Sequence, residues 1–580
     1  MAIKRYTATA DNTITNAFEA NLQTRGTGSN MGESDIVETF AIYNQVPAVN
    51  AKNWLYVNEE TPAIATDGSE TFTLVGSQEY VFVAKAAPGA MEFDASGDRT
   101  DVLTNIAEII NSSASSDFTA SLFNYSVQIE SVVLGTAGNS DTLSSSLNNT
   151  TPQIAATFVG GTGGREESKI LLNFPVSEIS SSRDAGEIPA SGSVDFFLRV
   201  HNAPHGQTLP RDYDLSILPV SRSWDEGYGL DMEDYTDLGV SNWVSSSSGT
   251  AWTREGGDYH STPTYQQSIT TGPQDVEVNI TELVEEWLDE SKKRDGVGIS
   301  ISSSFAEMDR SFYIKKFFAR GSEHFYLRPK IEARWQTNIL DDRGNFWASS
   351  SLCNDIDNIN SIFIYNRIDG ELKDLPSLAT NMSVSLYSGS TGPTGSPVPY
   401  TPTVVKHVST GIYSTEVKVK EVDYYLYDVW SSSTSGMSVT GSAITVKHRR
   451  TETSANTSEQ VSNITNLKPK YVQSESPRLR MFIRDKDWNP TIYTVATTNI
   501  QTKIVSEAYY NVRRVADGYD AIPYGTGSIE YTKMSYDKDG NYFDLDMSLL
   551  EEGYSYGIKV SYKNSGRFEE QPELWKFRVE

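Results

Sequence analysis

Short runs in which hydrophobic and polar residues alternate recur along most of this chain. Such runs occupy residues 168–174, 382–387, 479–484, 509–515 and 542–547. A period of two places one set of side chains on each face of a strand, and Gly, Asn, Asp and Ser between the runs favour tight turns. The pattern predicts a mainly β, multi-domain protein built from β-sandwiches or jelly rolls.

Two segments have the 3.6-residue period of a helix instead. Residues 101–111 place the apolar positions 102, 103, 106, 109 and 110 on one face. The second segment, residues 281–288, has an apolar face made by Leu283, Val284, Trp287 and Leu288. Its other side carries three glutamates that are expected to face water, Glu282, Glu285 and Glu286. Paired carboxylates can hydrolyse glycosides, but adjacent solvated glutamates favour a structural helix that plugs one end of a jelly roll.

A segment dense in Trp and Gly runs from Arg222 to Trp335. Its characteristic pieces are Ser223-Trp224-Asp225-Glu226-Gly227, Gly239-Val240-Ser241-Asn242-Trp243, Trp252-Thr253-Arg254-Glu255-Gly256-Gly257, Phe317-Phe318-Ala319-Arg320-Gly321 and Arg328-Pro329-Lys330-Ile331-Glu332. On these residues the segment resembles the jelly-roll modules of the DNRLRE type, which occur in secreted surface proteins and in tailed-phage virion proteins. The resemblance implies a module that builds or attaches surfaces and does not usually carry chemistry.

The resemblance divides the N-terminal half of the chain. Residues 1–45 resemble the opening of the same module, so they are expected to form one jelly roll with residues 165–336. Residues 46–164 are then an insertion, with a predicted hairpin at 65–84, the helix at 101–111 and strands at 118–122 and 127–133. This insertion is similar to a small α+β module of phage tail and fibre proteins. Its glycine-rich end, 160–164, is a poor phosphate loop because no Lys-Ser/Thr or helix follows.

The C-terminal half predicts two further β-sandwiches. Residues 337–459 have the size of an immunoglobulin-like sandwich, and the polar residues 451–459 are expected to link it to the last unit, 460–580. Within that unit, residues 549–556 resemble a tyrosine corner, in which a Tyr hydroxyl ties a loop to the backbone. In its amino-acid sequence the unit is similar to C-terminal domains of structural proteins from marine contractile-tailed phages, especially cyanophages.

Composition and charge narrow the classes of function. At 580 residues the chain has room for roughly three to five domains. Aromatic residues make up 11% of it, which argues against disorder. The net charge of −28 argues against a nucleic-acid-binding protein, which needs a basic face. The densest basic run, residues 447–450, is short and favours a solvated turn.

Candidate chemistry is sparse. The single cysteine, Cys353, cannot form an intrachain disulfide and is expected to be an inert thiol. With no leader or apolar span in the sequence, we expect a protein made in the cytoplasm. Residues 537–542 resemble a calcium loop superficially, but the glycine is fourth and strands flank it, so a hairpin turn is favoured. His201 and His205 are the one ligand-spaced histidine pair, and zinc would need two further ligands. The sequence therefore predicts no catalytic residue, metal or cofactor.

Two hypotheses for the function follow. The first is a non-enzymatic structural component of a tailed-phage virion, at the neck or collar, tail, fibre attachment or capsid surface. It would assemble in the host cytoplasm and contact other virion proteins and copies of itself, without nucleic acid or membrane. The alternative is a carbohydrate-binding adhesive protein, such as a receptor-binding fibre component. Trp224, Trp243 and Trp252 would then stack on sugars, although tryptophans in such a module more often anchor the core.

Overall fold

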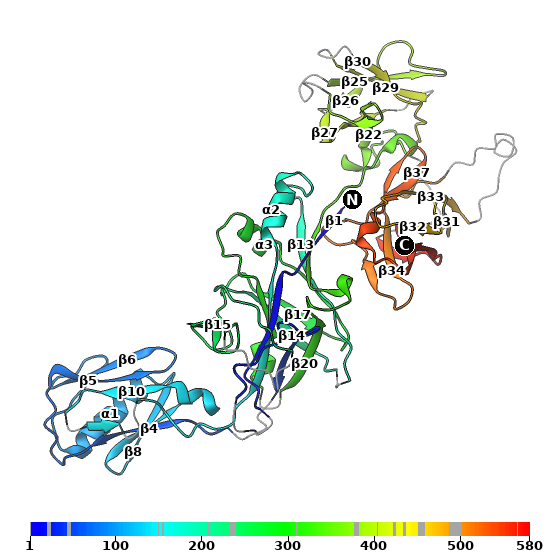
Figure 1. Cartoon of the computed structure of the whole chain (residues 1–580). Coiled ribbons are helices and arrows are strands. Elements are labelled where there is room, and N and C mark those ends of the chain that lie inside the picture. Colours follow the sequence, from blue (N-terminus) through cyan, green and yellow to red (C-terminus); the bar gives the residue numbers. More distant parts are fainter. Residues whose placement is uncertain are drawn as a thin grey trace. The chain divides into compact units, whose positions relative to one another are not determined.

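The computed structural model is mainly β, as the alternating pattern predicts (Figure 1). It describes the whole chain except residues 1, 20, 21, 23, 24, 43–47, 149, 153–155, 207, 208, 231–238, 309, 310, 376–381, 403, 421–424, 433–436, 450–458, 487–501 and 565. Two compact units divide the chain. The N-terminal unit comprises Arg5–Ser191 and Phe196–Glu332, and the C-terminal unit comprises Met1–Lys4, Gly192–Asp195 and Ala333–Glu580.

Two sheets form the first sandwich, called the host sandwich below. The larger sheet has seven strands, in the order β17-β14-β19-β12-β3-β20 with β2 also on β12. They are β2 (Ala10–Thr15), β3 (Ile36–Ile42), β12 (Glu166–Asn173), β14 (Tyr213–Pro219), β17 (Tyr265–Ile269), β19 (Val297–Ile301) and β20 (Phe312–Phe318). The smaller sheet has the order β1-β21-β13-β18. Its strands are β1 (Ile3–Thr7), β13 (Asp195–Val200), β18 (Val276–Asn279) and β21 (Lys330–Arg334).

Short elements complete the host sandwich. They are α2 (Val176–Asp184), β15 (Ser245–Ser247), β16 (Thr250–Ala251), α3 (Thr281–Leu288), α4 (Ser303–Ala306) and the 3₁₀ turn Phe325–Leu327. Helix α3 has the predicted bounds and buries Trp287. Helix α2 packs beside it (Figure 1). The sequence did not reveal α2, because its nine residues are mostly polar and too few to display a clear apolar stripe.

Contact with α2 also corrects the expectation that the glutamates of α3 all face water. The carboxylate of Glu285 is half-buried and accepts two hydrogen bonds from Arg183 of α2, at 2.7 and 2.6 Å. Glu286 pairs with Lys292 at 2.7 Å. Of the three, only Glu282 is exposed. The two inner glutamates therefore attach α3 to its surroundings.

The inserted domain, defined here as the elements β4 to β11, has two four-stranded sheets and a helix. The sheets have the orders β10-β5-β6-β7 and β11-β4-β9-β8. The strands are β4 (Lys52–Val57), β5 (Asp67–Val75), β6 (Glu79–Lys85), β7 (Glu92–Phe93), β8 (Phe118–Phe123), β9 (Ser126–Ser131), β10 (Thr142–Ser145) and β11 (Thr150–Pro152). Helix α1 (Arg99–Ser113) buries Val102, Leu103, Ile106, Ala107 and Ile110 in a core shared with Phe72, Phe82 and Phe118. A 3₁₀ turn, Gly135–Ser140, follows β9.

The β5–β6 hairpin and α1 agree with the pattern of the sequence, because the apolar face of the helix is long enough to be recognised. The predicted start of the insertion, residue 46, lies outside the described residues, as does the predicted linker at 451–459 apart from Glu459.

The strands of the middle domain, β22 to β30, enclose a core around Trp430. One sheet pairs β22 (Asn360–Tyr365), β26 (Tyr400–Pro402) and β27 (Lys406–Ser409) with β28 (Ile412–Val419), and another pairs β25 (Met382–Gly389) and β30 (Met437–Thr440) with β29 (Tyr425–Ser432). Two short strands, β23 (Arg367–Ile368) and β24 (Glu371–Leu372), form a small hairpin. The 3₁₀ turns Asp342–Gly344 and Ile356–Asn358 precede β22.

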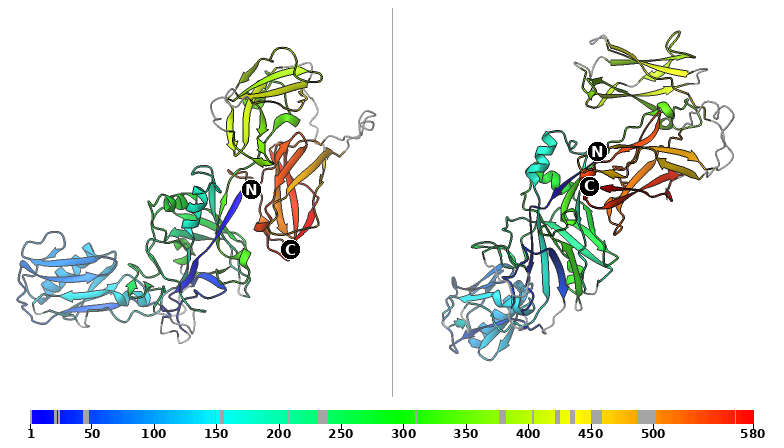
Figure 2. Two further views of the ribbon diagram at one scale, coloured as in Figure 1. Left: turned by 45° about the horizontal axis from the view of Figure 1, so that its top comes forward. Right: turned by 45° about the vertical axis from the view of Figure 1, so that its right-hand side comes forward.

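The C-terminal sandwich, β31 to β40, has two sheets, of four and six strands (orange to red in Figure 2). The first has the order β31-β33-β37-β36, from β31 (Gln460–Ile464), β33 (Arg478–Asp485), β36 (Ser535–Asp537) and β37 (Gly540–Asp544). The second has the order β32-β40-β38-β34-β35 with β39 on β38. Its strands are β32 (Lys470–Tyr471), β34 (Ala508–Arg514), β35 (Asp520–Ile522), β38 (Ser555–Asn564), β39 (Arg567–Glu570) and β40 (Trp575–Val579), and the 3₁₀ turn Met547–Leu549 precedes β38.

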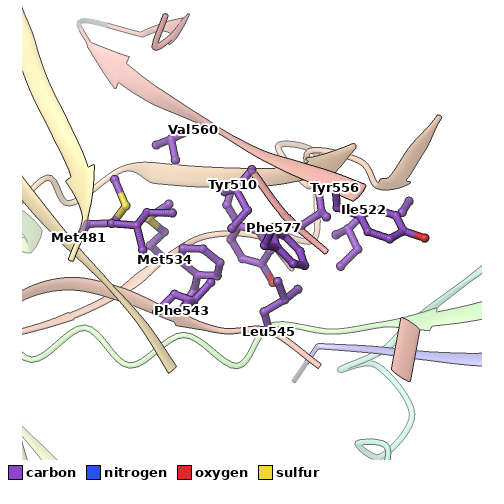
Figure 3. Packing of buried hydrophobic residues seen from close by; sticks show 14 of the residues in the cluster. Met481, Tyr510, Ile522, Met534, Phe543, Leu545, Tyr556, Val560 and Phe577 are labelled. Atoms are coloured by element: carbon purple, nitrogen blue, oxygen red, sulfur yellow. The ribbon is translucent and has the colours of Figure 1, made fainter. Parts of the chain in front are cut away.

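Aromatic side chains fill the space between these two sheets. Tyr510 stacks on Phe543 with ring centroids 4.2 Å apart, and Phe577 lies beside Tyr556 (Figure 3). Ala2 and Ile3 belong to the same buried cluster. The N-terminal residues, which the sequence assigned to the jelly roll, therefore also contribute to the C-terminal unit.

Two local predictions for the C-terminal sandwich are confirmed. Asp537 pairs with Gly540 across a two-residue turn, so the calcium-like segment is a hairpin. Glycine is required at this turn, because its φ is +111° and a Cβ would lie 2.5 Å from Thr502. The tyrosine corner is formed by Tyr556, whose hydroxyl accepts a hydrogen bond from Glu551 N at 2.8 Å and donates one to Glu551 O at 3.1 Å.

Replacing Tyr556 by Phe should destabilise the C-terminal sandwich. The substitution keeps the buried ring but leaves the backbone N–H and C=O of Glu551 without these partners, which should lower the free energy of unfolding by about 1–3 kcal/mol. Calorimetry of the full chain measures the shift. The matched control is Tyr554→Phe, whose ring packs against Arg514 outside the corner; equal shifts for the two variants would contradict the corner's role.

Candidate functional site

The three tryptophans that the sequence singles out for glycan binding lie together in the host sandwich. Trp224, Trp243 and Trp252 are all buried, in one cluster with Ile14, Leu171 and Val220. Stacking on a sugar needs an exposed ring face, and none of the three rings presents one in this arrangement. The geometry favours the other interpretation of these residues, as anchors that hold the segment after Arg222 against the large sheet.

Polar contacts fix the same tryptophans. The indole N–H of Trp224 donates to Asp295 O at 2.9 Å, and that of Trp252 donates to Asn242 O at 2.8 Å. The ammonium of Lys169, on β12, lies 5.4 Å from the ring centroid of Trp243. Burial lowers the pKa of Lys169. Each ring is thus held by the sandwich itself, as a core anchor must be.

A half-buried ion cluster around the buried Asp11 uses two residues of the characteristic motifs. Arg320 donates to both carboxylate oxygens of Glu226, at 3.0 and 2.8 Å. Asp11, on β2, donates its backbone N–H to Glu226 at 2.8 Å and accepts a hydrogen bond from the backbone N–H of Arg320. Burial, helped by the nearby carboxylate of Glu226, raises the pKa of Asp11 to about 7, against the backbone hydrogen bond and the charge of Arg320. The cluster joins three distant segments of the chain.

Asp11 could not be recognised as a site residue beforehand, because one aspartate in an alternating strand looks like an ordinary outward-facing residue. Its partners Glu226 and Arg320 stand inside recognisable motifs, but their pairing depends on the fold.

The histidine pair does not form a metal site. His201 Nδ1 lies 2.9 Å from Asp275 Oδ2, and burial lowers the pKa of His201 to about 3, so the ring is neutral. Throughout the described part of the chain no group of three or more His, Cys, Asp or Glu side chains could hold a metal ion. The same residues include no helix long and apolar enough to cross a membrane.

An open groove of about 820 Å³ lies where the inserted domain joins the host sandwich. Its apolar lining comes from Val132, Val133, Leu134 and Met308, and its charged lining from Arg25, Arg165, Glu167, Glu255 and Glu307. Burial raises the pKa of Glu167. The position of the groove suggests a site, but the bonds of its central arginine indicate a structural role.

Arg25 uses its guanidinium to hold chain segments together. It donates to Asn16 O and Arg165 O at 2.8 Å, to Gly163 O at 2.9 Å and to Thr136 Oγ1 at 3.1 Å. Gly164 lies against it with a φ of +111°, and a Cβ there would be 2.8 Å from Arg25 Nη2. The glycine-rich end of the insertion therefore packs around an arginine of the host sandwich.

Exposed apolar side chains gather at the turn between β8 and β9. The hairpin tip, defined as Leu122, Phe123, Asn124 and Tyr125, exposes 51% of Leu122, 50% of Phe123 and 64% of Tyr125. The guanidinium of Arg99 lies 4.6 Å from the ring centroid of Tyr125. Neighbouring large apolar groups left in water mark contact surfaces. The sequence missed this surface because the run 118–122 looks like any other half-buried strand.

Comparison with known proteins leaves the family of the chain open. No family model matches the sequence, and no curated protein matches it. The adhesin InvE of Yersinia pseudotuberculosis is similar in structure at 11% identity and a TM-score of 0.14, over 40% of this chain and 56% of the adhesin, so only about half of the adhesin is spanned. The full ectodomain of mouse nectin-like molecule 4 is similar at 8% identity and a TM-score of 0.11, over 67% of this chain and 94% of that one. At such TM-scores neither structure assigns a function.

Truncation of a buried tryptophan should affect stability. Trp252→Ala removes a ring from the core and should lower the free energy of unfolding of the N-terminal unit by about 3–5 kcal/mol, with Trp252→Phe intermediate. Chemical unfolding followed by fluorescence measures this. Tyr125→Ala, at an exposed position, is the control and should change stability by less than about 0.5 kcal/mol. Unchanged stability of Trp252→Ala would contradict the anchor role.

The raised pKa of Asp11 predicts a pH dependence of stability. The folded chain holds this proton more tightly than the unfolded chain, so the contribution of Asp11 is greatest below about pH 4 and is lost as the pH rises to about 7. Asp11→Asn should flatten this decline, which we expect to be roughly 1–4 kcal/mol. Unfolding of the N-terminal unit is measured from pH 4 to pH 8. The control Asp225→Asn, at an exposed position of the same sandwich, should show the same loss of stability with rising pH as the parent. A parent protein whose stability does not fall between pH 4 and pH 7 would refute the prediction.

Proposed function

We propose that this chain is a non-enzymatic structural component of a tailed-bacteriophage virion that acts by protein–protein assembly. The proposal covers the neck or collar, the tail, a fibre attachment site and the capsid surface. It is supported by the resemblance of residues 222–335 to surface-building jelly-roll modules. The single structural observation that favours it is the hairpin tip, an apolar surface with no covering element among the described residues.

The remaining candidate residues fit a structural component. The motif residues Trp224, Trp243, Trp252, Glu226 and Arg320 are used for anchoring and ion pairing inside the sandwich. Because these residues stabilise the domain from inside, its outer surface is free to contact neighbouring proteins. The excess of acidic residues favours solubility before assembly and opposes non-specific association.

A carbohydrate-binding adhesive function is the second candidate, with the exposed Tyr125 in place of the buried tryptophans as the residue that would stack on a sugar. Tyr125 exposes an aromatic ring beside Arg99, next to a small depression of about 210 Å³ lined by Glu60, Asp98 and Asn124. An aromatic face with nearby polar groups is suited to a sugar. Glycan-array binding that is lost in Tyr125→Ala would favour this candidate over assembly.

Cryo-electron microscopy of native particles that contain the chain tests the proposal directly. Ordered density for the chain, repeated with the symmetry of the particle and in contact with other virion proteins, is the expected result. Absence of the chain from purified particles would refute a structural role in the virion.

Substitutions at the hairpin tip test whether this surface makes a contact. The double variant Leu122→Ser, Phe123→Ser should fold normally, because both side chains are exposed, and should bind its neighbour roughly tenfold more weakly or more. The occupancy of the variant in reconstituted particles measures this loss. Val81→Ser removes an apolar side chain of similar exposure from β6 of the same domain and is the matched control. Equal occupancy of both variants would show that the tip is not a contact.

A further inference from the structure

The two sheets of the host sandwich meet where β13 ends. Beyond β13, Asn202 forms a bridge with Phe317 of β20, which belongs to the other sheet. Two backbone hydrogen bonds hold this bridge: Ala203 N donates to Lys316 O, and Phe318 N donates to His201 O, both at 3.0 Å. This short pairing connects the small sheet directly to the large one.

Lys315 lies at this junction with its side chain buried. It is two residues before Phe317, on the same face of β20, and that face packs inward: Lys315 is only 1% exposed and Phe317 is fully buried. Diagonal neighbours across an antiparallel pair come within reach of long side chains. The lysine can therefore reach back to the side chain of Asn202.

The contact between these side chains is short. Lys315 Nζ lies 2.7 Å from Asn202 Oδ1 and 2.6 Å from Gly272 O. Because a C=O bond is about 1.23 Å long, Nζ lies at most about 4 Å from Asn202 Cγ. The ring centroid of Phe317 is 5.5 Å from Nζ. An amine is thus held against an amide carbon in a place that largely excludes water.

The buried position of the amine favours its reactivity. Burial lowers the pKa of Lys315 to about 8, against the attraction of the Asp275 carboxylate, so a substantial fraction of the amine is neutral in mildly alkaline solution. Asp275 also orients the acceptor. It accepts hydrogen bonds from the backbone N–H of Asn202 at 2.8 Å and from His201 Nδ1 at 2.9 Å.

From this geometry we propose that Lys315 and Asn202 form an intramolecular isopeptide bond. Neutral Nζ attacks Cγ of Asn202, and the N–Cγ bond forms as the bond from Cγ to Nδ2 breaks. Nδ2 leaves as ammonia, taking up the proton that Nζ gives up, and a secondary amide remains. Overall, a lysine ammonium and an asparagine amide become one amide and one ammonium ion. No oxidant, metal or other reactant is consumed.

Asp275 is assigned as a positioning residue for this step. It holds the backbone of Asn202 in place, and its negative charge acts on Lys315. Burial raises the pKa of Asp275, but the hydrogen bonds from His201 and from the backbone N–H of Asn202 outweigh it and keep this pKa below the usual range, so the group is a carboxylate at neutral pH.

The isopeptide bond would give the host sandwich a covalent cross-link between its two sheets, in place of a disulfide. The chain has one cysteine, so it cannot make an intrachain disulfide. The link would join residues 113 positions apart and tie the small sheet to the large one. A cross-link of this span restricts the unfolded chain strongly.

The chain contains an internal control for the proposal. In the middle domain, Lys447 Nζ lies 3.0 Å from Asn345 Oδ1, the same two groups at a similar distance. Lys447 is exposed, however, and Asn345 Oδ1 also accepts a hydrogen bond from the indole of Trp347. We expect no bond between Lys447 and Asn345, because water solvates the ammonium and the amide there.

Mass spectrometry of the full-length protein tests the proposal. The expected intact mass is lower than the sequence mass by one molecule of ammonia, and a protease digest should contain one branched peptide that joins residue 315 to residue 202. Cyclisation of an asparagine to a succinimide also releases ammonia, so the branched peptide decides. Protein that retains the full sequence mass and gives separate peptides after prolonged incubation at pH 8 would overturn the proposal, as would equal linkage of Lys447 to Asn345.

Variants separate the bond from the contact. Lys315→Arg keeps the charge and Asn202→Ala removes the amide; both should show no branched peptide and a lower unfolding temperature. Asp275→Asn should slow the appearance of the branched peptide after synthesis, a readout that a purely structural role would not move. If the Lys315 variant does not fold, the peptide map of the parent protein still decides. A parent that is unlinked overturns the isopeptide bond without bearing on assembly into particles.

Discussion

The pairing of β12 with β2 and β3 is the constraint on which the N-terminal unit depends. Residues 10–15 and 36–42 precede the inserted domain and residues 166–173 follow it, yet they form adjacent strands with Ser168 opposite both Thr15 and Phe40. Loop-closure entropy rises only slowly with length, so a folded domain between paired strands costs little. Arg25 reinforces the closure, because its guanidinium joins the segment after β2 to the end of the insertion.

Buried ion pairs connect strands inside this sandwich. Glu332 is completely buried and is paired with Arg5 at 2.8 Å and Arg199 at 3.0 Å across the small sheet. Buried pairs of this kind contribute little net stability compared with apolar residues, but removing one partner leaves a costly uncompensated charge. They specify which strands pair more than they strengthen the pairing. The same holds in the middle domain, where fully buried Asp428 binds Arg343 and the indole of Trp430.

The sequence predicted those features that depend on local pattern. Helix α3 has the expected bounds, and the hairpin at Asp537 follows from turn chemistry alone. What the sequence could not predict depends on distant residues. A lysine such as Lys315 in an alternating strand is ordinarily placed on the wet face, and only the fold shows that its face turns inward toward Asn202. Likewise, the glutamates of α3 were expected in water because α2, which supplies Arg183, was not recognised.

Whether the tryptophan and tyrosine rings are buried or exposed says more about function than how many of them there are. A surface that binds sugars by stacking must expose aromatic rings. Trp224, Trp243 and Trp252 are instead buried in the core of the host sandwich. Leu122, Phe123 and Tyr125 of the hairpin tip, in the inserted domain, are adjacent large apolar side chains that do meet solvent, as single side chains elsewhere in the chain also do. Burying such a patch against another protein recovers free energy in proportion to its apolar area. The tryptophan-rich motif block therefore anchors the host sandwich, and the insertion carries an exposed apolar surface at its hairpin tip.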